Sequence, residues 1–209
     1  MRRLLGAAAA GYLLGALPSA TAAARLARGG SIDVRSAGTG NPGGANVLRL
    51  VGRAAGIAVT CAAVGKGVVA CRAGRAIAGD AGAHLAGVAA VAGHCYPAHA
   101  HFRGGMGVAT SFGQCLATFP VYAPLDAGVA VTVAKLAPKR HRVALSLLVS
   151  SGLWVGVGAV WWRRGLPNLW GPEPSPLLPL ANAATSGLIA SRGVLAVRKR
   201  RRTELDAAR

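Results

Sequence analysis

The sequence predicts an all-α integral membrane protein with about seven transmembrane helices, an N-terminus outside and a C-terminus in the cytoplasm. Its 209 residues are 53% hydrophobic and only 14% charged, with a mean hydropathy of +0.43, whereas soluble domains contain about 25% charged residues. Apolar stretches of near membrane-spanning length recur along the chain, and the charges lie in short clusters between them. Both patterns are typical of a multi-pass membrane protein.

Each apolar stretch is near the roughly 20 residues that a helix needs to cross a bilayer. None shows the alternation that marks a strand, and a backbone in lipid must satisfy its own hydrogen bonds, so we expect helices. Their many small residues would allow close helix packing. The expected spans are residues 4–24, 54–71, 77–98, two short helices within 107–137 broken near Pro120, Pro124 and Asp126, 143–162 and 177–197.

The first apolar stretch also resembles a secretory signal peptide. Arg2 and Arg3 precede an apolar core, and small residues at 22–24 resemble a cleavage site. Because similar stretches recur down the chain, we favour a first span that is retained.

The basic residues predict the orientation. The chain has 24 Lys and Arg against 6 Asp and Glu, and the excess of Lys and Arg marks cytoplasmic loops. Most of these residues fall inside when the C-terminus is cytoplasmic. Residues 1–197 are then one multi-pass membrane domain, and 198–209 form a basic cytoplasmic tail that can lie against anionic lipid.

The formal net charge of +18 would also suit a nucleic-acid-binding protein. The clustering of the charge, with no RNA-recognition or zinc-finger pattern, favours membrane lipids as partners and no nucleic acid. The four cysteines show no CxxC and no ligand-like spacing with the five histidines. We interpret them as small apolar residues and expect no metal.

Residues 33–49, DVRSAGTGNPGGANVLR, form a polar loop rich in glycine. The G-x-G-x-x-G match inside it lacks a preceding strand and an acidic residue about 20 positions later, so we do not interpret it as a dinucleotide site. Its glycines expose backbone N–H groups, Thr39, Asn41 and Asn46 add neutral donors, and Arg49 adds a cation. This is a natural phosphate clamp. A reentrant turn whose asparagines cap helices explains the pattern equally well.

A second glycine loop, FRGGMGVAT at 102–110, opens an apolar stretch. Such loops often bind an anion, although the side chain of Met106 has no hydrogen-bond donor and no positive charge for an anion. The predicted topology places both loops on the inner face, where they can meet at one site.

Four segments in order resemble the bacterial acyl-phosphate:glycerol-3-phosphate acyltransferases of the PlsY type. They are GYLLGALP at 11–18, DVRSAGTGNPGGANVLRLVG at 33–52, Lys66-Gly67, and GHCYPAHAHFRGGMGVAT at 93–110. The family carries D-[IV]-R-x-x-G-S-G-N-x-G-A-T-N-x-x-R, then D-x-x-K-G, then G-H-x-[FY]-P-x-x-x-x-F-K-G-G-K-G-V-A-T. The match covers most of the first 110 or so residues at the right spacing.

The resemblance implies a seven-helix enzyme of the bacterial plasma membrane with three cytoplasmic motif loops and no metal or nucleotide cofactor. It would act, as a monomer, on acyl phosphate and glycerol 3-phosphate. The fatty acyl group would move to the sn-1 hydroxyl, giving lysophosphatidic acid for phospholipid synthesis.

Carried over by position, the resemblance implies a set of site residues in this chain. Thr39, at the family's serine, and Arg49 are the expected catalytic residues. The expected substrate-binding residues are Gly40, Asn41, Gly43, Asn46, Lys66, His94, Arg103, Gly104, Gly105, Gly107 and Thr110. Ala63 occupies the place of the family's aspartate, so we expect Lys66 to snorkel or to find a ligand charge.

Several positions depart from the family pattern. Met106 replaces a phosphate-contacting lysine, Ala45 replaces a threonine, and the C-terminal segment lacks the histidine and asparagine of the family motif. We favour an active acyltransferase in which Arg103 or Lys66 takes over the lost contact. The alternatives are a homologue that binds lipid phosphate or uses another acceptor, and a small transporter or assembly subunit.

Overall fold

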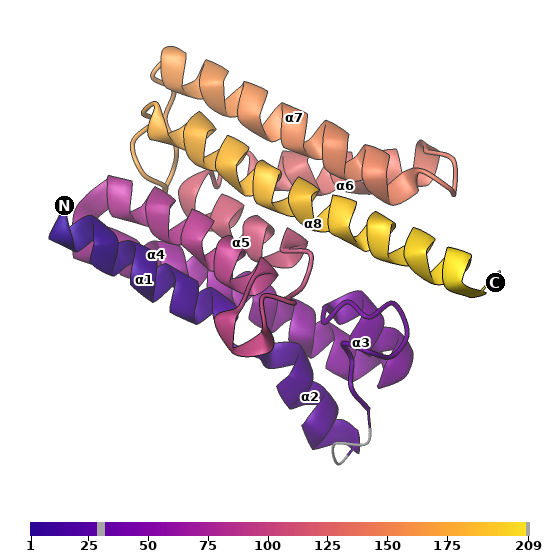
Figure 1. Cartoon of the computed structure of the whole chain (residues 1–209). Helices are drawn as coiled ribbons and strands as arrows, with labels where there is room; N and C mark the ends of the chain where they lie inside the picture. Colours follow the sequence, from indigo (N-terminus) through magenta and orange to yellow (C-terminus); the bar gives the residue numbers. More distant parts are fainter. Residues whose placement is uncertain (29–31, 208–209) are drawn as a thin grey trace.

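The computed structural model of the chain describes residues 1–28 and 32–207, with side chains described as far as residue 198. Every regular element in these ranges is a helix (Figure 1). The helices are α1 (Arg2–Ala16), α2 (Ser19–Arg28), α3 (Gly44–Leu50), α4 (Arg53–Cys95), the 3₁₀ turn η1 (Ala98–Ala100), α5 (Val108–Thr118), α6 (Ala123–Leu136), α7 (Arg142–Arg163) and α8 (Leu177–Ala207).

The long helix α4 is a helical hairpin rather than one rod. Its backbone leaves the helical conformation at Ala78 and Gly79, where Gly79 has φ +63°. In an unbroken helix, Gly74 and Gly82 would lie about 12 Å apart. Here a methyl group on Gly74 would overlap the carbonyl oxygen of Gly82. The limbs 53–77 and 80–95 therefore run side by side, and they correspond to the predicted spans 54–71 and 77–98.

Four described segments are long and apolar enough to cross a bilayer, beginning at Arg2, Arg53, Arg142 and Leu177. The second contains both limbs of α4, while α5 and α6 are the two short helices expected within 107–137. The predicted all-α, multi-pass membrane fold is thereby confirmed. The side of the membrane that each terminus faces stays a prediction.

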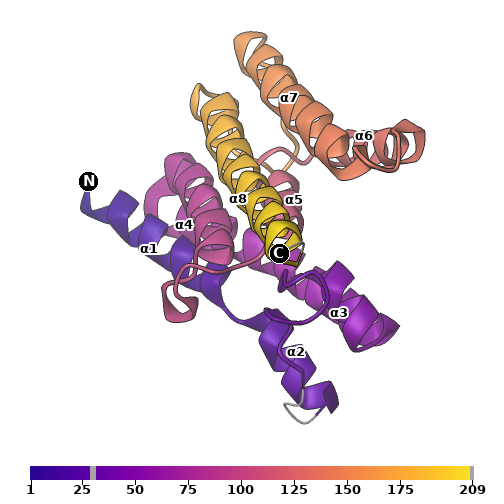
Figure 2. The ribbon, with the colours of Figure 1, turned by 45° about the vertical axis from the view of Figure 1, so that its right-hand side comes forward.

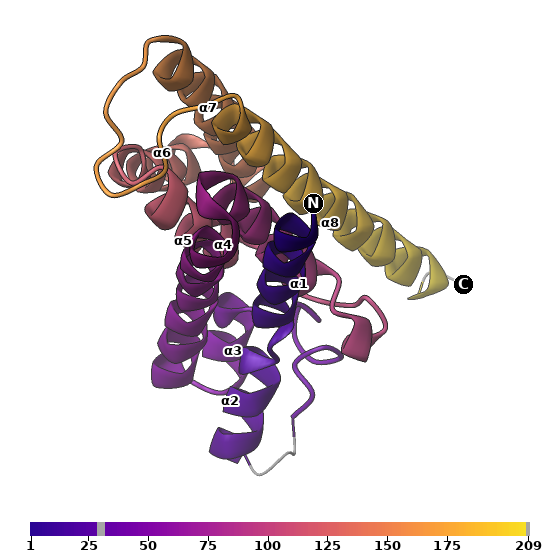
Figure 3. The same cartoon turned by 90° about the vertical axis from the view of Figure 1, so that its left-hand side faces the viewer.

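The first predicted span, 4–24, is wrong as a single helix. α1 ends at Ala16, Leu17 adopts an extended conformation with φ −52° and ψ 129°, and α2 begins at Ser19. Pro18 explains the break, because proline lacks an N–H group and disfavours helical geometry in the residue before it. Figure 3 shows α2 turning away from the line of α1. The break leaves carbonyl groups at the end of α1 available to other partners.

Glycines allow the central helices to touch through their backbones. Methyl groups on Gly11 and Gly15 of α1 would overlap the carbonyl oxygens of Ala86 and Ala90 in the second limb of α4. The same relation joins Gly113 of α5 to the carbonyl of Val64 in the first limb. This is the close packing that small residues permit in membrane helices.

The remaining helices pack around this centre. α8 lies against α4 and α7, and the α6–α7 pair stands on the outer side of the bundle (Figure 2). A cluster of buried aromatic and aliphatic side chains joins α5, α6, α7 and α8. Its largest members are Phe119, Tyr122, Trp154 and Leu178.

Candidate functional site

The two glycine-rich loops and the α1–α2 break meet at one end of the bundle. The Nε of Arg35, in the first loop, donates to the carbonyl oxygen of Arg103, in the second, at 3.3 Å. Its Nη1 donates to the hydroxyl of Thr21 in α2 at 3.1 Å. An open pocket with about 290 Å³ of empty space lies among these segments. Its lining comprises Gly15 to Thr21, Arg35, Pro42, Lys66, His94, Pro97, Gly104 and Gly105.

Lys66 is a buried cation in the wall of this pocket. Its side chain is only 8% exposed, and its Nζ donates to the carbonyl oxygens of Leu17 at 2.9 Å and Gly15 at 3.3 Å. These carbonyls lie where Pro18 ends α1, at the negative end of the helix dipole. They supply the partners that a carboxylate at Ala63 would otherwise provide. An ammonium group has three donors, so one N–H is left for a ligand.

His94 shapes the wall formed by the second loop. The N–H groups of Gly105 and Gly104 donate to the carbonyls of His94 and Cys95, at 3.0 and 3.1 Å. A methyl group on Gly105 would overlap Nε2 of His94, and one on Gly104 would overlap the His94 carbonyl oxygen. Gly105 therefore lets the loop backbone lie directly on the imidazole, and Gly104 lets it lie on the main chain of His94.

Arg192 of α8 binds the carbonyl groups of the same two glycines. Its Nη2 donates to the carbonyl of Gly104 at 2.6 Å and its Nε to that of Gly105 at 3.2 Å. The guanidinium carbon lies 5.3 Å from the centre of the Tyr96 ring, which is a cation–π distance. Tyr12 of α1 adds a third tie, because its hydroxyl donates to the carbonyl of Tyr96 at 2.8 Å. Three helices thus fix the position of the second loop.

Asn46 fixes the first loop. Its side chain is 2% exposed, its Nδ2 donates to the carbonyls of Val34 and Ala37 at 3.0 and 3.1 Å, and its Oδ1 accepts from the N–H of Thr39 at 2.9 Å. All but one of its hydrogen-bonding positions is used inside the loop. Asn46 therefore shapes the loop that presents Thr39.

Asp33 anchors the start of the same loop. Its carboxylate accepts from the N–H of Arg35 at 2.9 Å and from the hydroxyl of Ser36 at 3.1 Å. The hydrogen bond from the Arg35 backbone holds the pKa of Asp33 below its usual value. An ionised Asp33 fixes the backbone of Arg35, and so directs its side chain toward the second loop.

Four of the expected site residues line the pocket, namely Lys66, His94, Gly104 and Gly105. Outside the lining, the surrounding loops carry Thr39, Gly40, Asn41, Gly43 and Arg103, and the last turn of α3 carries Arg49. Gly107 is the N-cap of α5 with φ +84°, and Thr110 is fully buried between α5 and α4. Their positions indicate roles in the turn and in helix packing.

Met106 is outside the pocket lining, although its neighbour Gly105 belongs to it. A methyl group on Gly193 of α8 would be 3.9 Å from Cε of Met106, so the thioether rests against α8. The charge of the pocket comes instead from Lys66 and Arg35, with no carboxylate among the lining residues. Arg35 and Arg192 were not among the expected site residues. Arg35 matches the arginine of the family segment D-[IV]-R, which was a signal for it, whereas the contact of Arg192 with Gly104 spans 88 positions of sequence. The arrangement suits a small organic anion.

Comparisons with known proteins agree on one family. The family model described as glycerol-3-phosphate acyltransferase matches residues 5–190. A protein of that name from Thermoanaerobacter sp. (strain X514) is 36% identical over 152 residues, which is 73% of this chain and 74% of the relative. Another of the same name, from Symbiobacterium thermophilum, is 40% identical over 151 residues, which is 72% of this chain and 73% of the relative.

Two solved structures have a similar fold. Both are of PlsY (YgiH), an integral membrane glycerol 3-phosphate acyltransferase. Its glycerol 3-phosphate form has a TM-score of 0.71 and 26% identity, and covers 94% of this chain and 90% of its own. Its lysophosphatidic acid form has a TM-score of 0.68 and 25% identity over the same shares.

Proposed function

This chain belongs to the glycerol-3-phosphate acyltransferase family, and we propose that it moves a fatty acyl group from acyl phosphate to the sn-1 hydroxyl of glycerol 3-phosphate. The products are lysophosphatidic acid and inorganic phosphate. The observation that carries the proposal is the cationic pocket in which Lys66 and Arg35 meet the backbone of Gly104 and Gly105. The relatives' names and the two PlsY forms support the same acceptor and product.

The reaction needs little more than placement of two phosphates. The acceptor hydroxyl oxygen attacks the acyl carbonyl carbon, the bond from that carbon to the phosphate oxygen breaks, and the hydroxyl proton passes to the departing phosphate. Acyl phosphate already carries a good leaving group, so positioning and charge stabilisation supply most of the catalysis. A strong general base is unnecessary, which agrees with a pocket lined without Asp or Glu.

Lys66 and Arg35, the two cations of the pocket, are proposed to bind phosphate at different depths. The N–H of Lys66 that remains after its two carbonyl contacts is proposed to bind a substrate phosphate deep in the pocket. Arg35 is proposed to bind phosphate nearer the opening, in the role that the family gives to the lysine replaced by Met106. Of the two residues expected to replace that lysine, Lys66 lines the pocket and Arg103 lies outside its lining.

Residues of the first loop and of α3 are proposed to receive the acceptor. Arg49 is exposed, and Thr39 presents its hydroxyl from the loop that Asn46 holds. Together with Asn41 and the backbone of Gly40 and Gly43, they are proposed to bind the phosphate of glycerol 3-phosphate. We further propose that the protein acts as a monomer in the bacterial plasma membrane, where its acyl donor and its product both partition.

Complementation tests this function. Cells that lack this acylation step should grow when they express the wild-type chain and should fail with Lys66→Met at equal membrane abundance. Lys135→Met, which removes a cation from α6 outside the pocket lining, is the matched control and should support growth. Failure of the wild-type chain, with folded protein in the membrane, would favour the homologue that binds lipid phosphate without transferring the acyl group.

A further inference from the structure

A second cavity lies at the end of the bundle opposite the glycine loops, where α4 turns between its limbs. It has about 750 Å³ of empty space, part of it open. Both limbs of α4, the end of α5 and the α7–α8 connection contribute to its walls. The lining residues are Cys71, Arg72, Arg75, Ala76, Ala83, Ala117 and Trp170.

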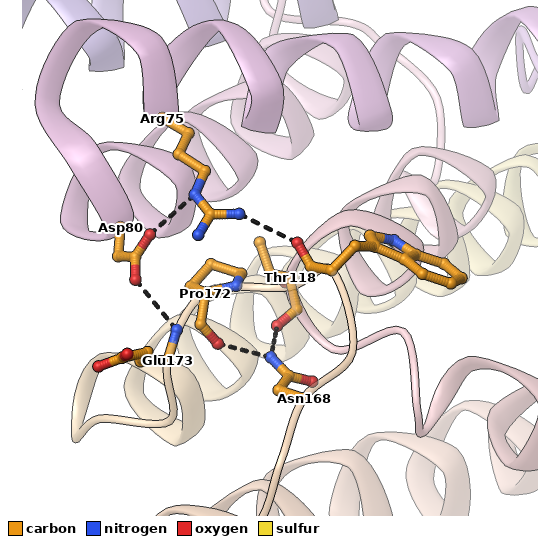
Figure 4. A network of polar contacts seen from close by, with 7 residues as sticks. Arg75, Asp80, Thr118, Asn168, Pro172 and Glu173 are labelled. Carbon is orange, nitrogen blue, oxygen red and sulfur yellow. Dashed lines mark hydrogen bonds and ion pairs between the residues drawn. The ribbon is translucent and has the colours of Figure 1, made fainter.

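A polar network makes this cavity rigid (Figure 4). Nε of Arg75 lies 2.9 Å from Oδ1 of Asp80 across the α4 turn, and its Nη1 donates to the carbonyl of Trp170 at 3.0 Å. Oδ2 of Asp80 accepts from the N–H of Glu173 at 3.0 Å. The α7–α8 connection is thereby tied to the α4 turn.

The Trp170 ring is fixed as well. Its Nε1 donates to the carbonyl of Leu116 at the end of α5, at 3.0 Å. The side chain remains 59% exposed, so the ring presents a broad apolar face beside the cavity. Tryptophan held in this way is typical of the level where lipid headgroups meet acyl chains.

Arg72 supplies a charge that this network does not neutralise. Asp80 balances Arg75, and within the described part of the chain Arg72 makes no ion pair. The other lining residues carry no acid, and Ala76, Ala83 and Ala117 give an apolar floor. A cation above an apolar floor at the end of membrane-spanning helices fits an anionic amphiphile better than a free ion.

We propose that this cavity, lined by Arg72 and Trp170, binds the phosphate headgroup of an anionic phospholipid whose acyl chains extend along α4. Val69, one turn before Arg72 on the same limb, is 52% exposed and offers apolar surface for those chains. The site is separate from the glycine-loop pocket, since the two share no lining residue. It therefore does not depend on the function proposed above.

Native mass spectrometry of the full chain in detergent tests the site. Phosphatidylglycerol and phosphatidylcholine of identical chains are titrated with glycerol 3-phosphate in excess, so that phosphatidylglycerol does not occupy the glycine-loop pocket. We expect Arg72→Gln to raise the Kd for phosphatidylglycerol about tenfold, the loss of one charge-assisted contact. Arg164→Gln removes another exposed cation, at the end of α7, and should change that Kd less than twofold.

Three results of this experiment would overturn the proposal. An equal rise of the Kd for phosphatidylglycerol in Arg72→Gln and Arg164→Gln would mean that the lipid is attracted diffusely to the basic surface. Equal binding of phosphatidylcholine would remove the role of the headgroup charge. Displacement of phosphatidylglycerol by inorganic phosphate at millimolar concentration would assign the cavity to a free anion.

Acyl transfer to glycerol 3-phosphate should remain within about twofold in Arg72→Gln, which separates this site from the catalytic pocket.

Discussion

Arg192 donates to the carbonyl oxygen of Gly104 at 2.6 Å, and this contact joins the last helix of the chain to the wall of the anion pocket. Its Nε makes a second contact, with Gly105, and its guanidinium stacks on Tyr96. Arg192 is absent from the pocket lining and reaches it only through the carbonyl groups of Gly104 and Gly105. It therefore positions the loop without contacting the substrate.

Replacing Arg192 should loosen the second loop. Arg192→Met keeps the length of the side chain but removes both donors, and we expect kcat/KM to fall at least tenfold, since a single charged hydrogen bond contributes roughly 1.5–3 kcal/mol. Arg192→Lys keeps one donor and should recover part of the loss. The positioning role also predicts a larger KM for glycerol 3-phosphate and faster amide exchange in residues 102–107, and unchanged exchange there would contradict it.

Removing the Lys66 ammonium should weaken phosphate binding directly. Lys66→Met is expected to reduce kcat/KM at least a hundredfold, because a buried cation and its ligand contact are lost together. The fold should persist, since the variant relieves the cost of a charge inside the membrane region. The measurement is steady-state acyl transfer in vesicles beside the melting temperature, with Lys135→Met as control. Full activity in Lys66→Met would remove this residue from the site.

Adding one methyl group at Gly105 should disrupt the wall. Gly105→Ala places Cβ onto Nε2 of His94, so the loop or the imidazole must move. We expect activity to fall about tenfold or more, as small misplacements at reacting centres do. Gly156→Ala in α7 meets nothing within 4 Å and serves as the control, with activity within about twofold of wild type. Similar behaviour of the two variants would mean that the His94 contact has no role.

The first loop should depend on the amide of Asn46. Asn46→Asp keeps the shape and the acceptor for Thr39 but turns a carboxylate oxygen toward the carbonyls of Val34 and Ala37. Leaving buried carbonyls unsatisfied costs about 1–3 kcal/mol each, so Asn46→Asp and Asn46→Ala should both lower the melting temperature. Amide exchange at 34–40 should accelerate in both. Wild-type protection of this loop in Asn46→Asp would show that the amide donors are dispensable.

Met106→Lys restores the lysine that the family has at this position and tests in which direction its side chain points. The Met106 side chain rests against Gly193 of α8, outside the pocket lining. A lysine that keeps this direction reaches the surface beside α8, so the KM for glycerol 3-phosphate should change less than about threefold, well below the ten- to hundredfold effect of a phosphate contact. A tenfold lower KM would instead mean that position 106 faces the substrate.

The sequence was sufficient for the membrane class, for the helical segments other than the broken first span, and for the identity of the two loops, because composition and motif spacing are local properties. It was insufficient for the partners of Lys66. Those are main-chain carbonyls of Leu17 and Gly15, about 50 residues away, and they become available only because Pro18 ends α1. The contact of Arg35 with Arg103 spans 68 positions, and that of Arg192 with Gly104 spans 88. Asn46, expected to bind substrate, has nearly all of its hydrogen-bonding capacity committed to its own loop.

The ratio of two products shows whether the protein transfers the acyl group to glycerol 3-phosphate. Purified protein in vesicles receives palmitoyl phosphate and isotopically labelled glycerol 3-phosphate, and inorganic phosphate and labelled lysophosphatidic acid are both quantified over time. We expect equal amounts of the two products, formed only when glycerol 3-phosphate is present and lost in Lys66→Met. Phosphate release without lysophosphatidic acid, or no release by well-folded protein, would contradict it.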